Sequence, residues 1–250
     1  MKNTHTTLKK IVLSLFLVFF LTGMLFAQER EIFRQGVGKD GDEVHFGEGK
    51  KIDGKKEGLW VIYVGKEADQ LESKYKHGEG LFLNDQQTGE WKNYYENGQL
   101  LFIGKFENGL QTGESRIYYE SGRLSGIINY ENGEANGEYK GYHENGLLSN
   151  IGELKKGIVS GEWKSYHENG KLLKIGKYEN GVQTGEWKAY HENGQLSMIG
   201  KYENGVQTGE WKVYHETGQL SMIGKYENGV ETGEWKYYDE NGELKGSINP

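Results

Sequence analysis

The sequence predicts an all-β protein: an elongated antiparallel β-meander of about eight 24-residue β-hairpin repeats that forms a twisted, single-sheet rod. Three observations support this prediction. Gly-Glu-Trp returns on a 24-residue grid, Asn-Gly occurs 11 times, and the only proline is Pro250. A fixed period of roughly 20 to 50 residues indicates stacked supersecondary units. Proline would remove ladder hydrogen bonds, so its near absence fits a long meander.

Each unit repeats the same columns of residues. The tryptophan column holds Trp91, Trp163, Trp187, Trp211 and Trp235, and its two missing places are filled by Ser115 and Tyr139. A tyrosine follows three residues later in every unit, and a glycine and a leucine come next. An earlier, degraded unit fits the grid at Trp60 and Tyr63. About seven extra residues follow it, and we expect them to lengthen a turn around Glu67-Ala68-Asp69.

Within a unit, two strand-like segments flank an Asn-Gly dipeptide. If Asn193-Gly194 forms a type I′ turn, the flanking strands pair in a fixed register. The expected opposed pairs, all on one face, are His191 with Leu196, Ala189 with Met198, and Trp187 with Gly200. We therefore expect the indole of Trp187 to lie over the cross-strand glycine.

The opposite face carries lysines, an isoleucine and a second tyrosine column. Its residues in one unit include Lys188, Tyr190, Ile199 and Lys201. The tryptophans are interpreted as the stacking ladder between repeats. The tyrosine column lies on the more polar face, so we predict that Tyr166, Tyr190 and Tyr214 form a partner-binding face.

The repeated unit G-E-W-K-x-Y-x-E-N-G-x-L-x-x-I-G-x-Y-x-N-G resembles the MORN-repeat variant of bacterial proteins. Many such proteins are labelled as antitoxins of toxin–antitoxin systems. The resemblance covers roughly residues 51–250. It implies a β-hairpin repeat rod that contacts proteins or membranes, and it carries over no catalytic residue because the motif is structural.

The first 27 residues read as a secretory signal peptide. Lys2, Lys9 and Lys10 precede an apolar run, and Ala27 marks a plausible cleavage point. An uncleaved N-terminal anchor is the alternative. Residues 28–50 form a glycine-rich leader, either flexible or containing an irregular strand around Val44-His45-Phe46, and residues 51–250 form the repeat domain. The prediction is therefore an exported protein of the periplasm, envelope or medium.

The charge of the chain argues against some partners. The formal net charge is −7, and it becomes −10 once the three lysines of the signal are removed. Nucleic acid and anionic membranes both require a basic cluster, and the lysines here are dispersed among glutamates. Cysteine is absent, so no disulfide can support the fold.

Two patterns could suggest chemistry. His143, His167, His191 and His215 form a column, but units are two strands apart, about 9.6 Å, while zinc binds nitrogen at about 2.1 Å. We therefore expect no metal site. The glutamates recur identically, so we interpret them as cross-strand partners of Lys188, Lys201 and Lys212 rather than as a catalytic pair. No cofactor or catalytic motif is evident.

Three functions fit these features. The first is an exported, non-enzymatic scaffold that binds a protein partner along several repeats. The second is a glycan- or envelope-binding module that uses exposed aromatic residues. The third is an antitoxin or immunity protein against a toxin that acts outside the cytoplasm.

Overall fold

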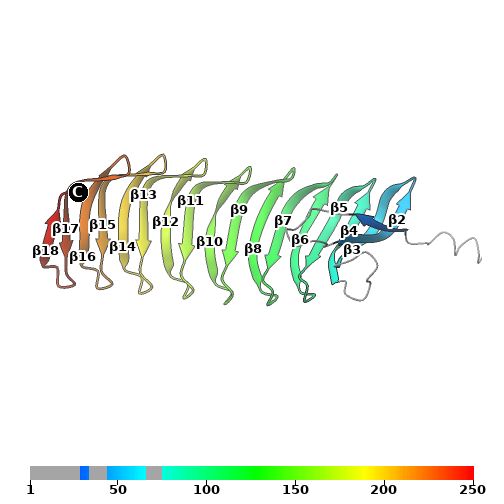
Figure 1. Cartoon of the computed structure of the whole chain (residues 1–250), viewed down its shortest axis with the longest axis horizontal. Coiled ribbons are helices and arrows are strands. Elements are labelled where there is room, and N and C mark those ends of the chain that lie inside the picture. The colour runs from blue at the N-terminus through cyan, green and yellow to red at the C-terminus, as the bar shows by residue number, and fades with distance from the viewer. Residues whose placement is uncertain (1–28, 34–43, 66–74) are drawn as a thin grey trace, which may run out of the picture. The chain divides into compact units, whose positions relative to one another are not determined.

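Every regular element in the described part of the chain is a β-strand (Figure 1). The computed structural model describes residues 29–33, 44–65 and 75–250. The predicted all-β meander of hairpins is confirmed. The predicted signal peptide and the lengthened turn around Glu67-Ala68-Asp69 lie outside the described residues.

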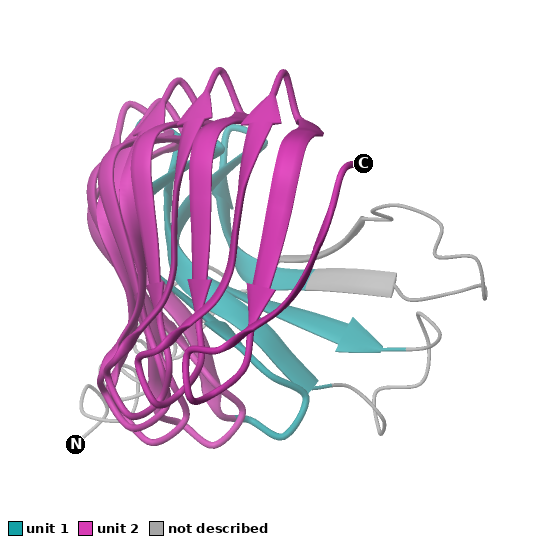
Figure 2. Ribbon diagram, turned by 90° about the vertical axis from the view of Figure 1, so that its left-hand side faces the viewer, with its two compact units in different colours: residues 1–98, 106–109 teal, residues 99–105, 110–250 magenta. Residues whose placement is uncertain are grey.

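The chain divides into two compact units (Figure 2). Unit 1 comprises residues 1–98 and 106–109, and unit 2 comprises residues 99–105 and 110–250. The described strands of unit 1 are β1 (Glu29–Phe33), β2 (Val44–Ile52), β3 (Lys55–Gly65), β4 (Tyr75–Leu83) and β5 (Gln86–Tyr94). Strand β6 (Leu100–Glu107) contributes residues to both units.

Unit 2 contains the regular repeats, each with one nine-residue and one eight-residue strand until the last hairpin. Its further strands are β7 (Leu110–Tyr118), β8 (Leu124–Glu131), β9 (Glu134–Tyr142), β10 (Leu148–Lys155), β11 (Ile158–Tyr166), β12 (Leu172–Glu179), β13 (Val182–Tyr190), β14 (Leu196–Glu203), β15 (Val206–Tyr214), β16 (Leu220–Glu227), β17 (Val230–Tyr238) and β18 (Leu244–Ile248).

Strands that follow one another in sequence pair antiparallel within each unit. In unit 1 the pairing runs from β1 to β5, and in unit 2 it runs from β7 to β18. Val44, His45 and Phe46 lie in β2, so this part of the leader is a paired strand. At the other end of the sequence, β18 pairs with β17 from Leu244 to Ile248.

The two Asn-Gly dipeptides of a repeat adopt different conformations. At Asn204-Gly205 both residues have positive φ, 50° and 80°, as a type I′ turn requires. At Asn193-Gly194 only the glycine does, with φ of 92°. The type I′ turn predicted at Asn193-Gly194 is therefore wrong, and that turn type occurs at Asn204-Gly205, the other Asn-Gly of the repeat.

The segment at Asn193 is instead a three-residue loop. The amide of His191 donates to the Gln195 carbonyl at 2.9 Å, and Leu196 pairs with Tyr190 across a register shift. A three-residue hairpin loop places glycine in the left-handed region, next to a bulge. The predicted pair of His191 with Leu196 is therefore wrong, whereas Ala189 with Met198 and Trp187 with Gly200 are confirmed.

Each indole covers a glycine, although not the one predicted. A Cβ placed on Gly176 would lie 2.0 Å from the Trp187 ring, and one on Gly200 would lie 2.2 Å from the Trp211 ring. Each tryptophan therefore packs onto the strand before its own, not onto the strand after it. The contact joins a hairpin to the preceding hairpin, and Trp187 and Trp211 are 1% and 4% exposed.

The tryptophans alternate with tyrosines in a continuous ladder. In unit 2 the edge-to-face ladder runs through Trp163, Tyr178, Trp187, Tyr202, Trp211, Tyr226 and Trp235, with ring centroids 5.1 to 6.4 Å apart. Edge-to-face contacts add stability beyond the area that they bury. Unit 1 has the same arrangement, with Trp60, Phe82, Trp91 and Phe106.

Two repeats lack the tryptophan, and their neighbours compensate. Ser115 is 1% exposed, and the ring of Phe102 lies over Gly104, where an indole would otherwise pack. At Tyr139 the facing glycine is replaced by Ile128. The Tyr139 ring instead stacks on Trp163, with centroids 5.5 Å apart and planes 10° apart.

Candidate interaction surfaces

One face of unit 2 is built from ion pairs and tyrosines. Residues alternate between the faces of a strand, so Glu186, Lys188 and Tyr190 of β13 share the face opposite Trp187. The Lys188 ammonium lies close enough to Tyr190 for the phenol to influence it electrostatically. The same arrangement recurs at Tyr166 and Tyr214. All three predicted tyrosines are half-buried and lie on this polar face, called here the Glu–Lys face.

The ion pairs of this face join residues on one strand rather than on two. Lys188 Nζ lies 2.7 Å from Glu186 Oε1, and Lys212 Nζ lies 2.7 Å from Glu210 Oε1. Lys201 similarly pairs with Glu203 at 2.8 Å. The cross-strand partners predicted for these lysines are therefore wrong. The hydrogen bond from Lys188 to Glu186 is the main cause that raises the pKa of this lysine above its usual value.

Shallow grooves open on the Glu–Lys face over two of the shorter strands, β12 and β14. One groove follows β14, with Ile199 and Lys201 in its lining and Glu186 and Glu210 from the two flanking strands. The groove over β12 has the equivalent lining, including Glu162, Ile175 and Glu186. Neither groove carries a charge arrangement that differs from its neighbour, as a catalytic pocket would require.

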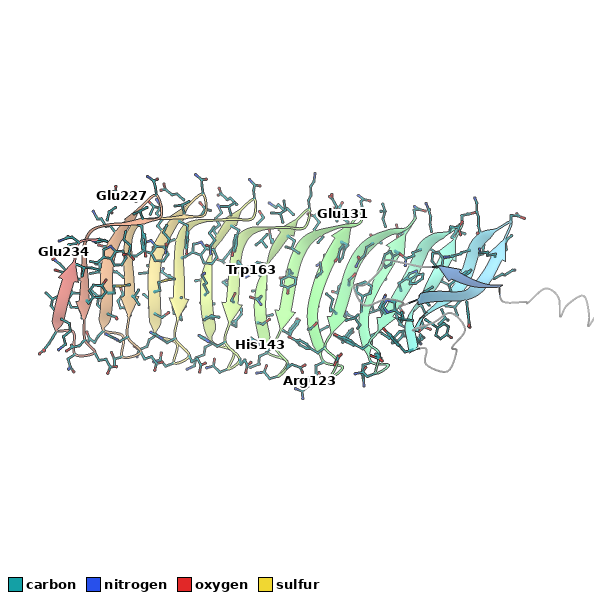
Figure 3. The ribbon with its side chains drawn as sticks, viewed as in Figure 1. Arg123, Glu131, His143, Trp163, Glu227 and Glu234 are labelled. Carbon is teal, nitrogen blue, oxygen red and sulfur yellow. The ribbon has the colours of Figure 1, made fainter. Side chains whose placement is uncertain are left out.

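The three-residue loops form one long edge of the repeats, where Figure 3 labels Arg123 and His143. Each histidine of the predicted column bonds the loop of the next repeat through Nε2, which lies 2.9 Å from a tyrosine carbonyl. A carbonyl only accepts, so Nε2 must carry the proton. The pairs are His143 with Tyr166, His167 with Tyr190, His191 with Tyr214 and His215 with Tyr238.

A second set of bonds reinforces this edge. Asn193 Nδ2 donates to the Glu216 carbonyl at 2.7 Å, while Asn193 Oδ1 accepts from the Gln195 amide at 2.8 Å. Asn145 and Asn169 repeat the pattern. Histidine and asparagine therefore clamp the loops at Asn145, Asn169 and Asn193 to the next loop. Among the described residues, no group of three or more acidic or histidine side chains could hold a metal ion.

The type I′ turns form the opposite edge, where Figure 3 labels Glu131 and Glu227. Each turn glycine donates its amide to the preceding repeat, as Gly205 does to the Gln183 carbonyl at 2.9 Å. A row of half-exposed aliphatic side chains lies beside these glycines, with Val182 41% and Val206 42% exposed. This row packs turn against turn, so the exposed apolar area has a structural role.

The chain matches a known repeat family. The MORN repeat variant matches six segments: residues 87–108, 111–132, 160–180, 183–204, 207–228 and 231–249. The chain belongs to the MORN repeat variant family. Among curated proteins, no match is found.

In this MORN repeat protein, the segments between the matched repeats include the unit that contains Tyr139. That unit differs at both members of the packed Trp–Gly pair, since Tyr139 and Ile128 replace them. MORN repeats are found in repeat scaffolds that often mediate contacts with proteins or membranes, and such an all-β scaffold is generally non-catalytic. Within the described residues, none forms a helix long and apolar enough to cross a membrane.

Sequence reasoning missed the clamps at the loop edge. It led to the expectation of no metal site at the histidine column, without identifying the carbonyl partners of these histidines. The sequence did contain a signal for these contacts, because each of these histidines and asparagines lies one period before another loop of similar sequence. The partner, however, is a backbone carbonyl, and no residue type marks a carbonyl in a sequence.

Proposed function

We propose that this MORN repeat protein is an exported, non-enzymatic scaffold that binds a protein partner along several repeats through its Glu–Lys face. One observation carries the proposal. Half-buried tyrosines, ion pairs and open grooves recur in register on one face, while the opposite face is filled by the aromatic ladder. A partner would therefore meet the same small contact surface once per repeat.

The energetics favour a long, shallow interface. Each exposed ion pair contributes little, about 0 to 1 kcal/mol. Linked contacts of this kind raise affinity through effective concentration rather than through any single residue. Tyrosine is also enriched in protein interfaces, because it offers a large, rigid contact area with a polar end.

The burial of the tryptophans weakens the glycan-binding alternative. Stacking on sugar rings requires exposed aromatic faces, and Trp187, Trp211 and Trp235 are between 1% and 4% exposed. The proposal includes export because residues 1–27 carry lysines followed by an apolar run, as a secretory signal peptide does. Fractionation of cells that express the full chain, with immunodetection in each fraction, tests export directly.

The binding test uses affinity for a partner captured from envelope extract. We expect Tyr190→Ala alone to weaken binding by about twofold to threefold, and Tyr166→Ala/Tyr190→Ala/Tyr214→Ala to weaken it by more than about tenfold. A matched control, Thr184→Ala/Thr208→Ala/Thr232→Ala, changes the same three repeats nearer the turn edge. Thermal melts of all variants establish that the fold is retained. Full-strength binding by a folded tyrosine triple variant would exclude this face.

A further inference from the structure

A row of alternating charge crosses the strands of the Glu–Lys face. The register of unit 2 places Glu162 opposite Lys177, Glu186 opposite Lys201, and Glu210 opposite Lys225. In these three hairpins the longer strand supplies the acid and the shorter strand supplies the lysine. The row therefore changes sign at each strand, about every 4.8 Å.

The grooves also give the charged row a recessed shape along the shorter strands. In the groove over β14, Lys201 lies on the central strand, and Glu186 and Glu210 come from the strands on either side. These acids remain available to a partner despite their own-strand ion pairs, because the Glu186 side chain is 59% exposed and that of Glu210 is 50% exposed.

We propose that this charge row docks onto the same row of a second copy of the chain. The second copy faces the first and is turned end for end about an axis that is parallel to the strands and passes between two of them. Each acid then faces a lysine of the other copy, and each longer strand faces a groove. The same residues are used by both copies, as a twofold interface requires.

The spacing selects this partner over others. A surface that satisfies the row must alternate in sign about every 4.8 Å, which is the distance between paired strands. The partner is therefore a β-sheet that carries opposite charges on neighbouring strands, and this chain has such a sheet. The row holds as many lysines as acids, so the row itself adds no net repulsion between the two copies.

When the two copies dock, the charged side chains change their ion-pair partners and the number of ion pairs does not increase. Glu186 already pairs with Lys188 on its own strand, so each intermolecular contact adds little alone. The addition of several repeats in register makes the dimer measurable, and exposed charges make it sensitive to salt. This inference rests on the proposed function of the same face, and names the partner.

Sedimentation velocity of the purified chain tests the inference. We expect a dimer at about 0.01 M salt, where the Debye length is about 30 Å, and weaker association at about 1 M, where it is about 3 Å. One variant, Glu162→Lys/Glu186→Lys/Glu210→Lys, makes the row uniformly positive. The other, Lys177→Glu/Lys201→Glu/Lys225→Glu, makes it uniformly negative. Each alone should dissociate at least about tenfold more readily, and an equimolar mixture should form a one-to-one heterodimer.

The neutral variant Glu162→Gln/Glu186→Gln/Glu210→Gln keeps the side-chain size and does not reverse the charge. It therefore tests the inference even if a charge-reversed variant misfolds. It should also weaken the dimer, with an unchanged circular dichroism spectrum. A wild-type chain that stays monomeric at low salt overturns the inference. So does a dimer that both reversed variants retain. If the captured partner still depends on the tyrosines in either case, the proposed function stands and only the second-copy docking is lost.

Discussion

Asn193 and Asn204 show how one dipeptide performs two tasks at the scale of single residues. Asn204 occupies the left-handed region, with φ of 50°, in a two-residue turn. Its side chain makes no hydrogen bond with the described part of the chain. Asn193 lacks positive φ and uses its side chain twice, toward Gln195 and toward Glu216. The first asparagine is needed for its backbone, and the second for its amide group.

Aspartate at these two positions should separate the roles. Asn193→Asp replaces the donor to the Glu216 carbonyl with an acceptor, so we expect unfolding free energy to fall by about 1 to 3 kcal/mol. Asn204→Asp keeps a residue that tolerates the left-handed region, so we expect a change within about 0.5 kcal/mol. Urea denaturation of both variants at neutral pH measures the difference. Equal losses would show that the clamp is not stabilising.

The contact between Gly200 and Trp211 allows a similar test. Gly200→Ala places a Cβ 2.2 Å from the indole, so the ring or the strand must move, and we expect a loss of about 1 to 3 kcal/mol. Gly246→Ala is the matched control, because no atom lies within 4 Å of its added Cβ. It should change stability by less than about 0.5 kcal/mol. Chemical denaturation gives both values, and similar losses would remove the packing role assigned to Gly200.

At the scale of elements, the sequence predicts the hairpins well because their register depends on side-chain alternation. Trp187 with Gly200 and Ala189 with Met198 follow from counting residues on either side of a turn. The loop geometry does not follow, because the same Asn-Gly letters suit both a two-residue and a three-residue connection. The glycine covered by Trp187 was also missed. A strand has two neighbours, and the alternation within one hairpin does not say toward which of them an indole leans.

Clamps between neighbouring hairpins give a further prediction. Tyr119 occupies the histidine column in an earlier repeat, and its hydroxyl donates to the Tyr142 carbonyl. Tyrosine can therefore replace the donor that histidine supplies. We expect His191→Tyr to change unfolding free energy by less than about 0.5 kcal/mol, and His191→Phe to lower it by about 1 kcal/mol, because the Tyr214 carbonyl loses its donor. Thermal denaturation that ranks Phe at or above Tyr would contradict the clamp.

At the scale of the whole molecule, the strand contacts of unit 2 are concentrated between sequence neighbours. Such a protein is stabilised by the sum of its repeats and of the interfaces between them. The repeat architecture could be predicted from the 24-residue period alone. The candidate site could be predicted only to the level of a face. Tyr190 and Lys188 share it by alternation, but the own-strand pairing of Lys188 with Glu186 depends on side-chain conformation, which a sequence does not specify.

Deletions test this modularity. Removal of Gly185–Thr208 takes out one whole period and leaves Thr184 joined to Gly209, which is the same junction as in the intact chain. We expect a folded protein with modestly lower stability. Removal of only Gly185–Leu196 takes out half a period, breaks strand alternation and should prevent folding of the flanking repeats. Circular dichroism and melts of the two variants measure this contrast. Equal loss of structure in both would refute nearest-neighbour stabilisation.

The clamps at the two edges point in opposite directions along the chain. On the loop edge, His191 and Asn193 donate forward to the following repeat, whereas on the turn edge Gly205 donates backward to the preceding one. The repeats that carry both His and Asn, at His143, His167 and His191, therefore offer their neighbours the same donors and acceptors. A tandem duplication of 24 residues inserts a segment whose hydrogen-bonding needs are already met on both sides. Gene-level recombination can thus lengthen the surface by about 9.6 Å per added unit without any new interaction having to arise.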